Sequence, residues 1–183
     1  MSKIIIGFVG QAGSGKGTAA NVLRLKHGAA VFAFSDILHD ILNRIYLPPS
    51  RENLQALSLC LRQTFGQDAL SNAMERQVDE SRAELVVVDG IRRMDDIADL
   101  RKNPSFHLIA MDAKPEARFE RIKNRNEKPG EAEMTWEGFL TMSQREAETM
   151  IADVAKQAER TLNNDGDVAG LEKQLEELIS TLK

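Results

Sequence analysis

The most constraining feature of this chain is a glycine-rich segment, residues 10–18, between a short apolar run and a helical pattern. It has the sequence Gly-Gln-Ala-Gly-Ser-Gly-Lys-Gly-Thr, with four residues between Gly10 and the Gly15-Lys16 pair. Glycines at this spacing let successive backbone N–H groups turn inward around an anion at a helix N-terminus. A lysine after the last such glycine reaches the β- and γ-phosphates. The segment therefore predicts a phosphate-binding loop.

Apolar, β-branched runs alternate with helical patterns along the rest of the chain. The expected strands are residues 4–9, 30–34, 85–88, 106–111 and, more weakly, 161–163. The expected helices are residues 16–25, 35–45, 50–65, 68–81, 94–102, 115–125, 135–160 and the C-terminal stretch. This alternation predicts an α/β fold with three α/β/α layers around a five-stranded parallel sheet, and ligands bind such sheets beyond the carboxyl ends of the strands.

Composition excludes several classes of protein. Of the 183 residues, 42% are hydrophobic and 28% are charged. The hydrophobic fraction is large enough to form a core and too large for a disordered chain. The net charge of −4 gives no cationic field for sequence-independent nucleic-acid binding. Cys60, the single cysteine, forms no internal disulfide or multi-cysteine zinc site. There is no apolar run of roughly 18 residues and no signal-peptide pattern. We expect a cytoplasmic monomer or homodimer that binds neither nucleic acid nor membrane.

The sequence Gly15-Lys16-Gly17-Thr18 resembles that of the adenylate kinase branch of P-loop kinases, the nucleoside monophosphate kinases. The strict pattern places Ser or Thr directly after the lysine, whereas here Gly17 intervenes and Thr18 becomes the candidate Mg²⁺ ligand. The resemblance implies a P-loop NTPase fold with ATP and Mg²⁺ as cofactors. It also implies that the loop binds ATP through Gly10, Ala12, Gly13, Ser14, Gly15, Lys16, Gly17 and Thr18.

A second motif, Asp89-Gly90-Ile91-Arg92-Arg93, follows the most β-branched run. It is similar to the strand-ending Asp, Gly and Arg of that family, in the Asp-Gly-Ile-Arg form of adenylate-kinase-related archaeal proteins. A carboxylate at a strand end can hold Mg²⁺ through water, and an arginine can bind phosphate bidentately. We predict Asp89 and Thr18 as the metal site, and Arg92 or Arg93 as an acceptor ligand. A capping aspartate in a surface turn is the alternative.

The expected lid begins beside two arginines spaced by four, Arg121 and Arg125, which share one helical face. They resemble the family's arginine pair, of which one member stacks on adenine and the other reaches phosphate. Arg145 lies where related kinases return a lid arginine toward the transferring phosphoryl group. Asn164 lies in a turn similar to that before the last helix of adenylate kinases and dephospho-coenzyme A kinases, and is expected to border the adenine. The alternative for Arg121 and Arg125 is a solvated charge run. The alternative for Arg145 is a salt-bridged helix arginine, and for the turn with Asn164 it is a plain helix-capping turn.

The acceptor segment of the family begins at the end of the second strand, where Asp36 matches its aspartate. The family's phosphate-binding arginine aligns with His39, and a histidine is a weak phosphate ligand at neutral pH. An ordinary polar helix residue is the alternative for His39. Arg62, in the middle of a later helix, is the strongest candidate for the missing charge, ahead of Arg44 and Arg51. Asp36 can alternatively act as a base toward an acceptor hydroxyl, as in dephospho-coenzyme A kinase.

The resemblance implies one P-loop kinase domain, divided into a core, a helical insertion and a short lid. The core comprises residues 1–34, 83–125 and 136–183, the acceptor-binding insertion about 35–82 and the lid about 126–135. The implied reaction transfers the γ-phosphoryl group of ATP to a nucleoside or deoxynucleoside monophosphate. Its catalytic residues would be Lys16, Asp36, Asp89, Arg121, Arg125 and Arg145. The alternatives are a dephospho-coenzyme A kinase-like enzyme and a P-loop ATPase that serves as a switch or assembly factor.

Overall fold

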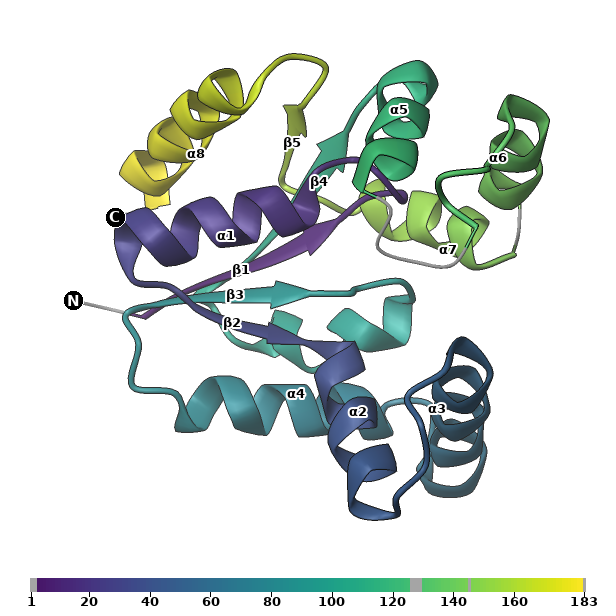
Figure 1. Cartoon of the computed structure of the whole chain (residues 1–183). Helices are drawn as coiled ribbons and strands as arrows, with labels where there is room; N and C mark the ends of the chain where they lie inside the picture. The colour runs from purple at the N-terminus through teal and green to yellow at the C-terminus, as the bar shows by residue number, and fades with distance from the viewer. Residues whose placement is uncertain (1–2, 126–129, 145, 183) are drawn as a thin grey trace.

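The computed structural model describes residues 3–125, 130–144 and 146–182 (Figure 1). Its strands form one parallel sheet in the order β2-β3-β1-β4-β5. The strands are β1 (Ile4–Val9), β2 (Ala30–Ala33), β3 (Leu85–Asp89), β4 (Phe106–Asp112) and β5 (Arg160–Asn163). The predicted five-stranded parallel sheet is confirmed.

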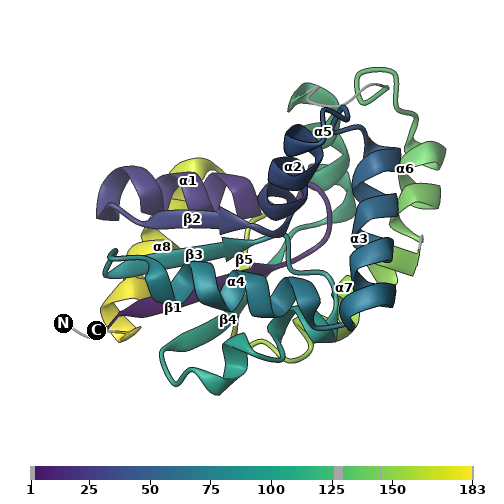
Figure 2. The ribbon, with the colours of Figure 1, turned by 90° about the horizontal axis from the view of Figure 1, so that it is seen from below.

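Helices cover both faces of the sheet, as the alternating pattern predicts (Figures 1 and 2). One face carries α1 (Lys16–His27) and α8 (Val168–Leu182). The other carries α4 (Ala69–Glu80), α7 (Glu146–Ala155) and two 3-10 helices, η1 (Met94–Ile97) and η2 (Leu100–Lys102). The three-layer α/β/α architecture follows.

The central strand β1 is buried along its whole length. Ile4, Ile6 and Phe8 belong to the core on the α1 and α8 face. Ile5 and Val9 belong to the core on the opposite face. This alternation is the period of two of an extended strand, and both sets are apolar because helices cover both faces.

The remaining helices lie around the carboxyl edge of the sheet (Figure 1). They are α2 (Phe34–Arg44), α3 (Arg51–Phe65), α5 (Pro115–Arg125) and α6 (Trp136–Ser143). In the view from below, α2 and α3 lie beyond the ends of β2 and β3 (Figure 2). The glycine-rich loop, which joins β1 to α1, opens at this same edge.

The helix expected over residues 94–102 is wrong, because the chain forms η1 and η2 instead. The carboxylate of Asp96 accepts hydrogen bonds from the backbone N–H groups of Arg92 and Arg93, at 2.9 and 3.0 Å. Side chains that bond the nearby backbone in this way compete with regular α-helix. The tighter turns also fit the short connection from β3 to β4.

The single helix expected over residues 135–160 is also wrong, because two helices, α6 and α7, lie there. Phe139 of α6 is buried against the rings of Phe119 and Trp136. Ile151 and Val154 of α7 are instead part of the core under the sheet. The two apolar sets face different partners, and one straight helix would not bury both. No described helix has the length and apolar character needed to cross a membrane.

We predict that Gly7→Ala destabilises the fold. An ideal Cβ at Gly7 would lie 2.7 Å from side-chain carbons of both Ile91 and Phe106. Overpacking of this kind lowers the free energy of unfolding by about 1–3 kcal/mol, which urea denaturation measures. Gly17→Ala is the control, since nothing lies within 4 Å of that Cβ position, and we expect it to be neutral or stabilising. Equal urea midpoints for the Gly7 variant and the wild type would contradict this packing.

Candidate functional site

Three glycines of the glycine-rich loop, Gly10, Gly13 and Gly15, are packed so closely that they have no room for a side chain. A Cβ at Gly10 would collide with the carbonyl oxygen of Met111, and one at Gly15 with the side-chain amide of Asn164. At Gly13 a Cβ would lie 2.6 Å from the carbonyl oxygen of Arg118. Gly13 and Gly15 also adopt φ values of +80° and +100°, which other residues rarely adopt. These contacts hold the loop's backbone in one path.

Two buried polar atoms beside the loop have no hydrogen-bond partner among the described residues. They are the hydroxyl of Ser14 and one terminal nitrogen of Arg121, Nη1. Buried polar atoms are almost always paired, so such exceptions mark places where a ligand can supply the partner. A hydroxyl, a guanidinium and a tight glycine cradle suit an anionic, phosphate-bearing ligand.

The ammonium group of Lys16 folds back over the loop. Its Nζ donates to the carbonyl oxygens of Gly10 at 2.6 Å and Gln11 at 3.2 Å. The charge therefore lies across the loop that a phosphate would fill, and a phosphate oxygen can replace a carbonyl as its partner.

The two predicted metal ligands lie on neighbouring elements. Thr18 is exposed in the first turn of α1, and Asp89 ends β3, where its Oδ1 accepts the N–H of Gly90 at 2.7 Å. The described residues include no group of three or more His, Cys, Asp or Glu side chains placed to hold a metal ion. A cation held by Thr18 and Asp89 would take its other ligands from phosphate and water, which is how Mg²⁺ binds beside nucleotides.

A pocket of about 140 Å³ adjoins the loop. Its lining includes two predicted site residues, Arg121 and Asn164, together with Gly15 and Thr18. Asn164 is 5% exposed, and its Nδ2 donates to the carbonyl oxygen of Ser14 at 2.9 Å. The structure thus brings Arg121 and Asn164 together beside the loop, as the resemblance to adenylate kinases implies.

The turn after β5 is anchored by Asp165. The backbone N–H of Lys114 donates to its Oδ1 at 2.7 Å, and the Asn163 amide donates to its Oδ2 at 3.1 Å. These hydrogen bonds favour the ionised carboxylate and hold the pKa of Asp165 below its ordinary value. The carboxylate therefore stays charged at neutral pH and ties the pocket-lining turn to the start of α5.

Arg118 is a site residue that the sequence reasoning missed. It is 5% exposed, and its guanidinium donates to the Ala12 carbonyl at 3.1 Å, the Gln11 side chain and the Ser143 hydroxyl at 3.1 Å. It also lies over the ring of Phe139, at 5.2 Å. Arg118 thereby joins the loop to α6. Its spacing of three from Arg121 and seven from Arg125, which places all three on one helical face, was the available signal.

The lid-base arginine, Arg125, forms a bidentate ion pair with Glu131, at 3.2 and 2.6 Å. Glu131 is 5% exposed, whereas the side chain of Arg125 is 32% exposed, so only the carboxylate of the pair is buried. Residues 126–129 of the expected lid and Arg145 lie outside the described residues. Among the lid-side arginines of the sequence analysis, the structure therefore places Arg121 at the pocket and Arg125 beside it on α5.

On the acceptor side, Asp36 is exposed in the first turn of α2, and its Oδ2 accepts the N–H of Ala33 at 3.2 Å. Ala33 pairs with Asp89 in the sheet, so Asp36 lies near the predicted metal ligand at the same edge. His39 is half-buried one turn later.

Arg62 takes a different place from the one expected, because it is 5% exposed and its Nη2 lies 2.5 Å from Asp96. Its guanidinium is committed to that carboxylate.

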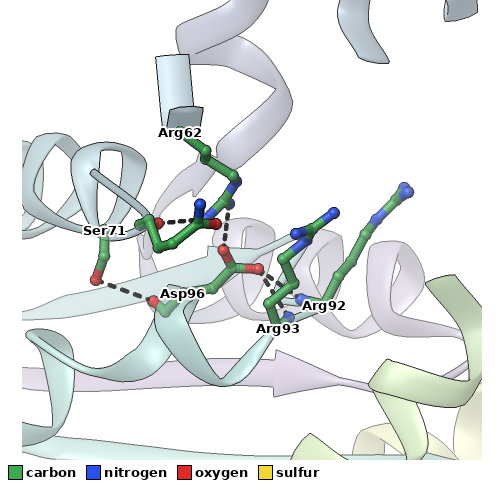
Figure 3. A network of polar contacts seen from close by, with 6 residues as sticks. Arg62, Ser71, Arg92, Arg93 and Asp96 are labelled. Carbon is green, nitrogen blue, oxygen red and sulfur yellow. Dashed lines mark hydrogen bonds and ion pairs between the residues drawn. The ribbon is translucent and has the colours of Figure 1, made fainter. Parts of the chain in front are cut away.

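Arg92 and Arg93 have fixed backbones and open side chains. Both backbone N–H groups donate to Asp96, and both side chains extend away from it (Figure 3). Within the described part of the chain, neither guanidinium has an ion-pair or hydrogen-bond partner. Two cationic groups are thus available at the end of β3.

Comparisons with known proteins agree on the class of fold. A family model described as an AAA domain matches residues 9–139. The chain is 32% identical over 182 residues to a UPF0200 protein of Methanoregula boonei, covering 98% of this chain and 97% of that protein. It is 29% identical to a UPF0200 protein of Hyperthermus butylicus, with coverages of 98% and 95%. The solved structure of shikimate kinase from Bacteroides thetaiotaomicron superposes with a TM-score of 0.66 at 17% identity, over 98% of both chains. TT1252 from Thermus thermophilus gives 0.61 at 19% identity, over 100% of both.

We predict that Arg118→Ala loosens the contact between the loop and α6. The change removes hydrogen bonds from a charged donor and a cation–π contact, so the free energy of unfolding should fall by about 2 kcal/mol. Trp136, which stacks on Phe139 at 5.3 Å and is the only tryptophan, should shift its emission to the red. Arg24→Ala is the control, because Arg24 is exposed and, among the described residues, its side chain bonds only Asn21 of its own helix. Matching spectra and stabilities for the two variants would refute the role of Arg118.

Proposed function

Because the chain belongs to the AAA domain family and to the UPF0200 proteins, and has a P-loop kinase-like fold, we propose that it is a phosphotransferase. In this proposal it moves the γ-phosphoryl group of ATP to a small nucleotide acceptor, a nucleoside or deoxynucleoside monophosphate that becomes the diphosphate. The core would bind ATP, and the insertion of about residues 35–82 would bind the acceptor. The lid of about residues 126–135 would exclude water from the site.

The observation that carries the proposal is the open guanidinium pair of Arg92 and Arg93, one strand away from the glycine-rich loop. β3 pairs with β1, so the arginines follow the strand beside the one that ends at Gly10. Phosphoryl transfer requires positive charge around both the donor and the acceptor phosphates. An ATPase switch requires only the donor half of that arrangement.

The ATP side of the site would be built from the loop and the adjoining pocket. The N–H groups of residues 10–18 and the Ser14 hydroxyl would bind phosphate oxygens, and Lys16 would reach the outer phosphates. Arg121 and Asn164 would border the adenine in the pocket. Mg²⁺, held by Thr18 and Asp89, would neutralise charge on the phosphates when bound. Arg145 would add positive charge from the lid side, and Arg125 would do so by exchanging Glu131 for a phosphate oxygen.

The acceptor side would be built from the ends of β2 and β3. Arg92 and Arg93 would hold the acceptor phosphate, with His39 as a weaker polar contact. Arg62 is left out of this set because Asp96 already binds its guanidinium. The acceptor would therefore meet fewer cationic groups than the sequence motifs alone indicate.

A hydroxyl acceptor is the second candidate, as in a dephospho-coenzyme A kinase-like enzyme. The exposed carboxylate of Asp36, close to Asp89 in the sheet register, favours it. Asp36 would take the proton of the acceptor hydroxyl while the hydroxyl oxygen bonds the γ-phosphorus of ATP. The bond between the γ-phosphorus and the oxygen that leaves with ADP would break in the same step. The loss of Arg62 from the acceptor set also weighs toward an acceptor whose reacting group is a neutral hydroxyl rather than a phosphate.

We predict that one acceptor class stimulates ADP release. The assay supplies Mg·ATP with nucleoside monophosphates, deoxynucleoside monophosphates or dephospho-coenzyme A and follows ADP. Lys16→Ala should abolish the stimulated rate, because it removes the charge on the outer phosphates. Lys26→Ala is the matched control, since Lys26 lies on the same helix and pairs with Glu172 at its surface. ADP release that no acceptor raises would contradict a kinase and favour the switch or assembly ATPase.

We predict that Asp36→Asn separates the two acceptor classes. With a hydroxyl acceptor the variant should lose about 10²–10⁴-fold in kcat, because the general base is gone. With a phosphate acceptor, which carries its own negative oxygen, kcat should change little. Asp40→Asn is the control, because Asp40 is an exposed acid one turn further along the same helix. Equal losses at Asp36 and Asp40 would exclude the base role.

A further inference from the structure

Helix α3 is attached to the rest of the molecule in an unusual way. Its only fully buried residue is Arg62, a charged one. Its apolar side chains Leu54, Leu57 and Leu61 are only partly buried against the core. The position of α3 therefore depends on where the guanidinium of Arg62 is held.

Arg62 is held by Asp96, which is 2% exposed and collects donors from two separate segments (Figure 3). Its Oδ1 lies 2.5 Å from Arg62 Nη2. Its Oδ2 accepts the backbone N–H groups of Arg92 and Arg93. In addition, the Ser71 hydroxyl of α4 donates to the Asp96 carbonyl oxygen at 3.3 Å. One carboxylate thus joins α3 to the turn that carries the arginine pair.

We propose that Asp96 is a positioning residue that sets the arginine pair at the acceptor site, an inference that rests on the proposed role of Arg92 and Arg93. One carboxylate oxygen fixes the peptide planes of the two arginines, so their side chains leave the turn in a defined direction. The other oxygen fixes α3 at a set distance from that turn. The insertion and the phosphate-binding arginines are thereby placed relative to one another before the acceptor arrives.

Two physical features support a role beyond simple stability. The Nε of Arg62 is buried without a partner, and a buried ion pair with an unpaired donor stabilises a fold less than apolar side chains of the same volume. Fixing a ligand-binding backbone in advance also reduces the entropy lost on binding.

The same segment provides a matched control in Asp99. This aspartate is 5% exposed and pairs with Lys102 through Oδ1 at 2.5 Å. Among the described residues, its carboxylate bonds neither the arginine pair nor α3. Asp96→Ala and Asp99→Ala therefore remove equally buried carboxylates, only one of which touches the proposed acceptor site.

Amide hydrogen exchange without any nucleotide tests the positioning directly. In Asp96→Ala the amides of Arg92 and Arg93 should exchange roughly tenfold faster or more, because they lose a charged acceptor. In Asp99→Ala and in Arg62→Met they should stay protected, although Arg62→Met should unfold at lower urea. If Asp96→Ala does not fold, Asp96→Asn should give a smaller rise in the same direction. Unchanged exchange in the Asp96 variant that folds would overturn the proposal.

A second experiment measures steady-state kinetics with the acceptor that stimulates ADP release. Asp96→Ala should raise the KM of that acceptor by roughly tenfold while the KM of ATP stays unchanged. An equal rise in both KM values, or a loss of kcat alone, would refute a positioning role at the acceptor site. The exchange arm needs no acceptor, so failure of the kinase proposal and failure of this inference give different results.

Discussion

The structure depends on three glycines of the glycine-rich loop, Gly10, Gly13 and Gly15, where there is no room for a Cβ. Backbone or side-chain atoms of Met111, Arg118 and Asn164 approach three of its glycines so closely that a Cβ would collide. These neighbours come from β4, α5 and the turn after β5, so one short loop aligns three segments that are distant in sequence. The same contacts place the pocket and α5 beside the loop. The loop, the pocket and α5 are therefore linked through one tightly packed backbone.

The two halves of the site are held by different physical means. The proposed ATP side is shaped by close backbone packing and by Arg118, which joins the loop to the Phe139 side of α6. The proposed acceptor side is held by a buried charge, because Asp96 binds both α3 and the turn after β3. The first is mainly close packing, whereas the second is a desolvated ion pair, and removing one partner of such a pair leaves a buried charge unpaired. Variants can therefore perturb the two halves separately.

Much of the fold could be predicted because its signals are local. The strands follow from apolar runs, and the parallel sheet from their alternation with helical patterns. The break between α6 and α7 could not be predicted, because the apolar positions of both keep helical spacing while facing different partners. Arg62 and Arg118 were misplaced or missed for a related reason. Arginines at helical spacing look alike in sequence, and only the tertiary structure shows that Asp96 and Ala12 lie opposite them.

The most direct test of phosphoryl transfer follows the γ-phosphorus itself. ³¹P NMR of the protein with Mg·ATP and the acceptor mixture reports where that atom goes. A kinase moves the γ resonance of ATP into a new phosphoanhydride or phosphomonoester signal on the acceptor, in amounts equal to the ADP formed. Appearance of the γ-phosphorus only as inorganic phosphate, whichever acceptor is present, would contradict phosphoryl transfer and assign the loop to ATP hydrolysis.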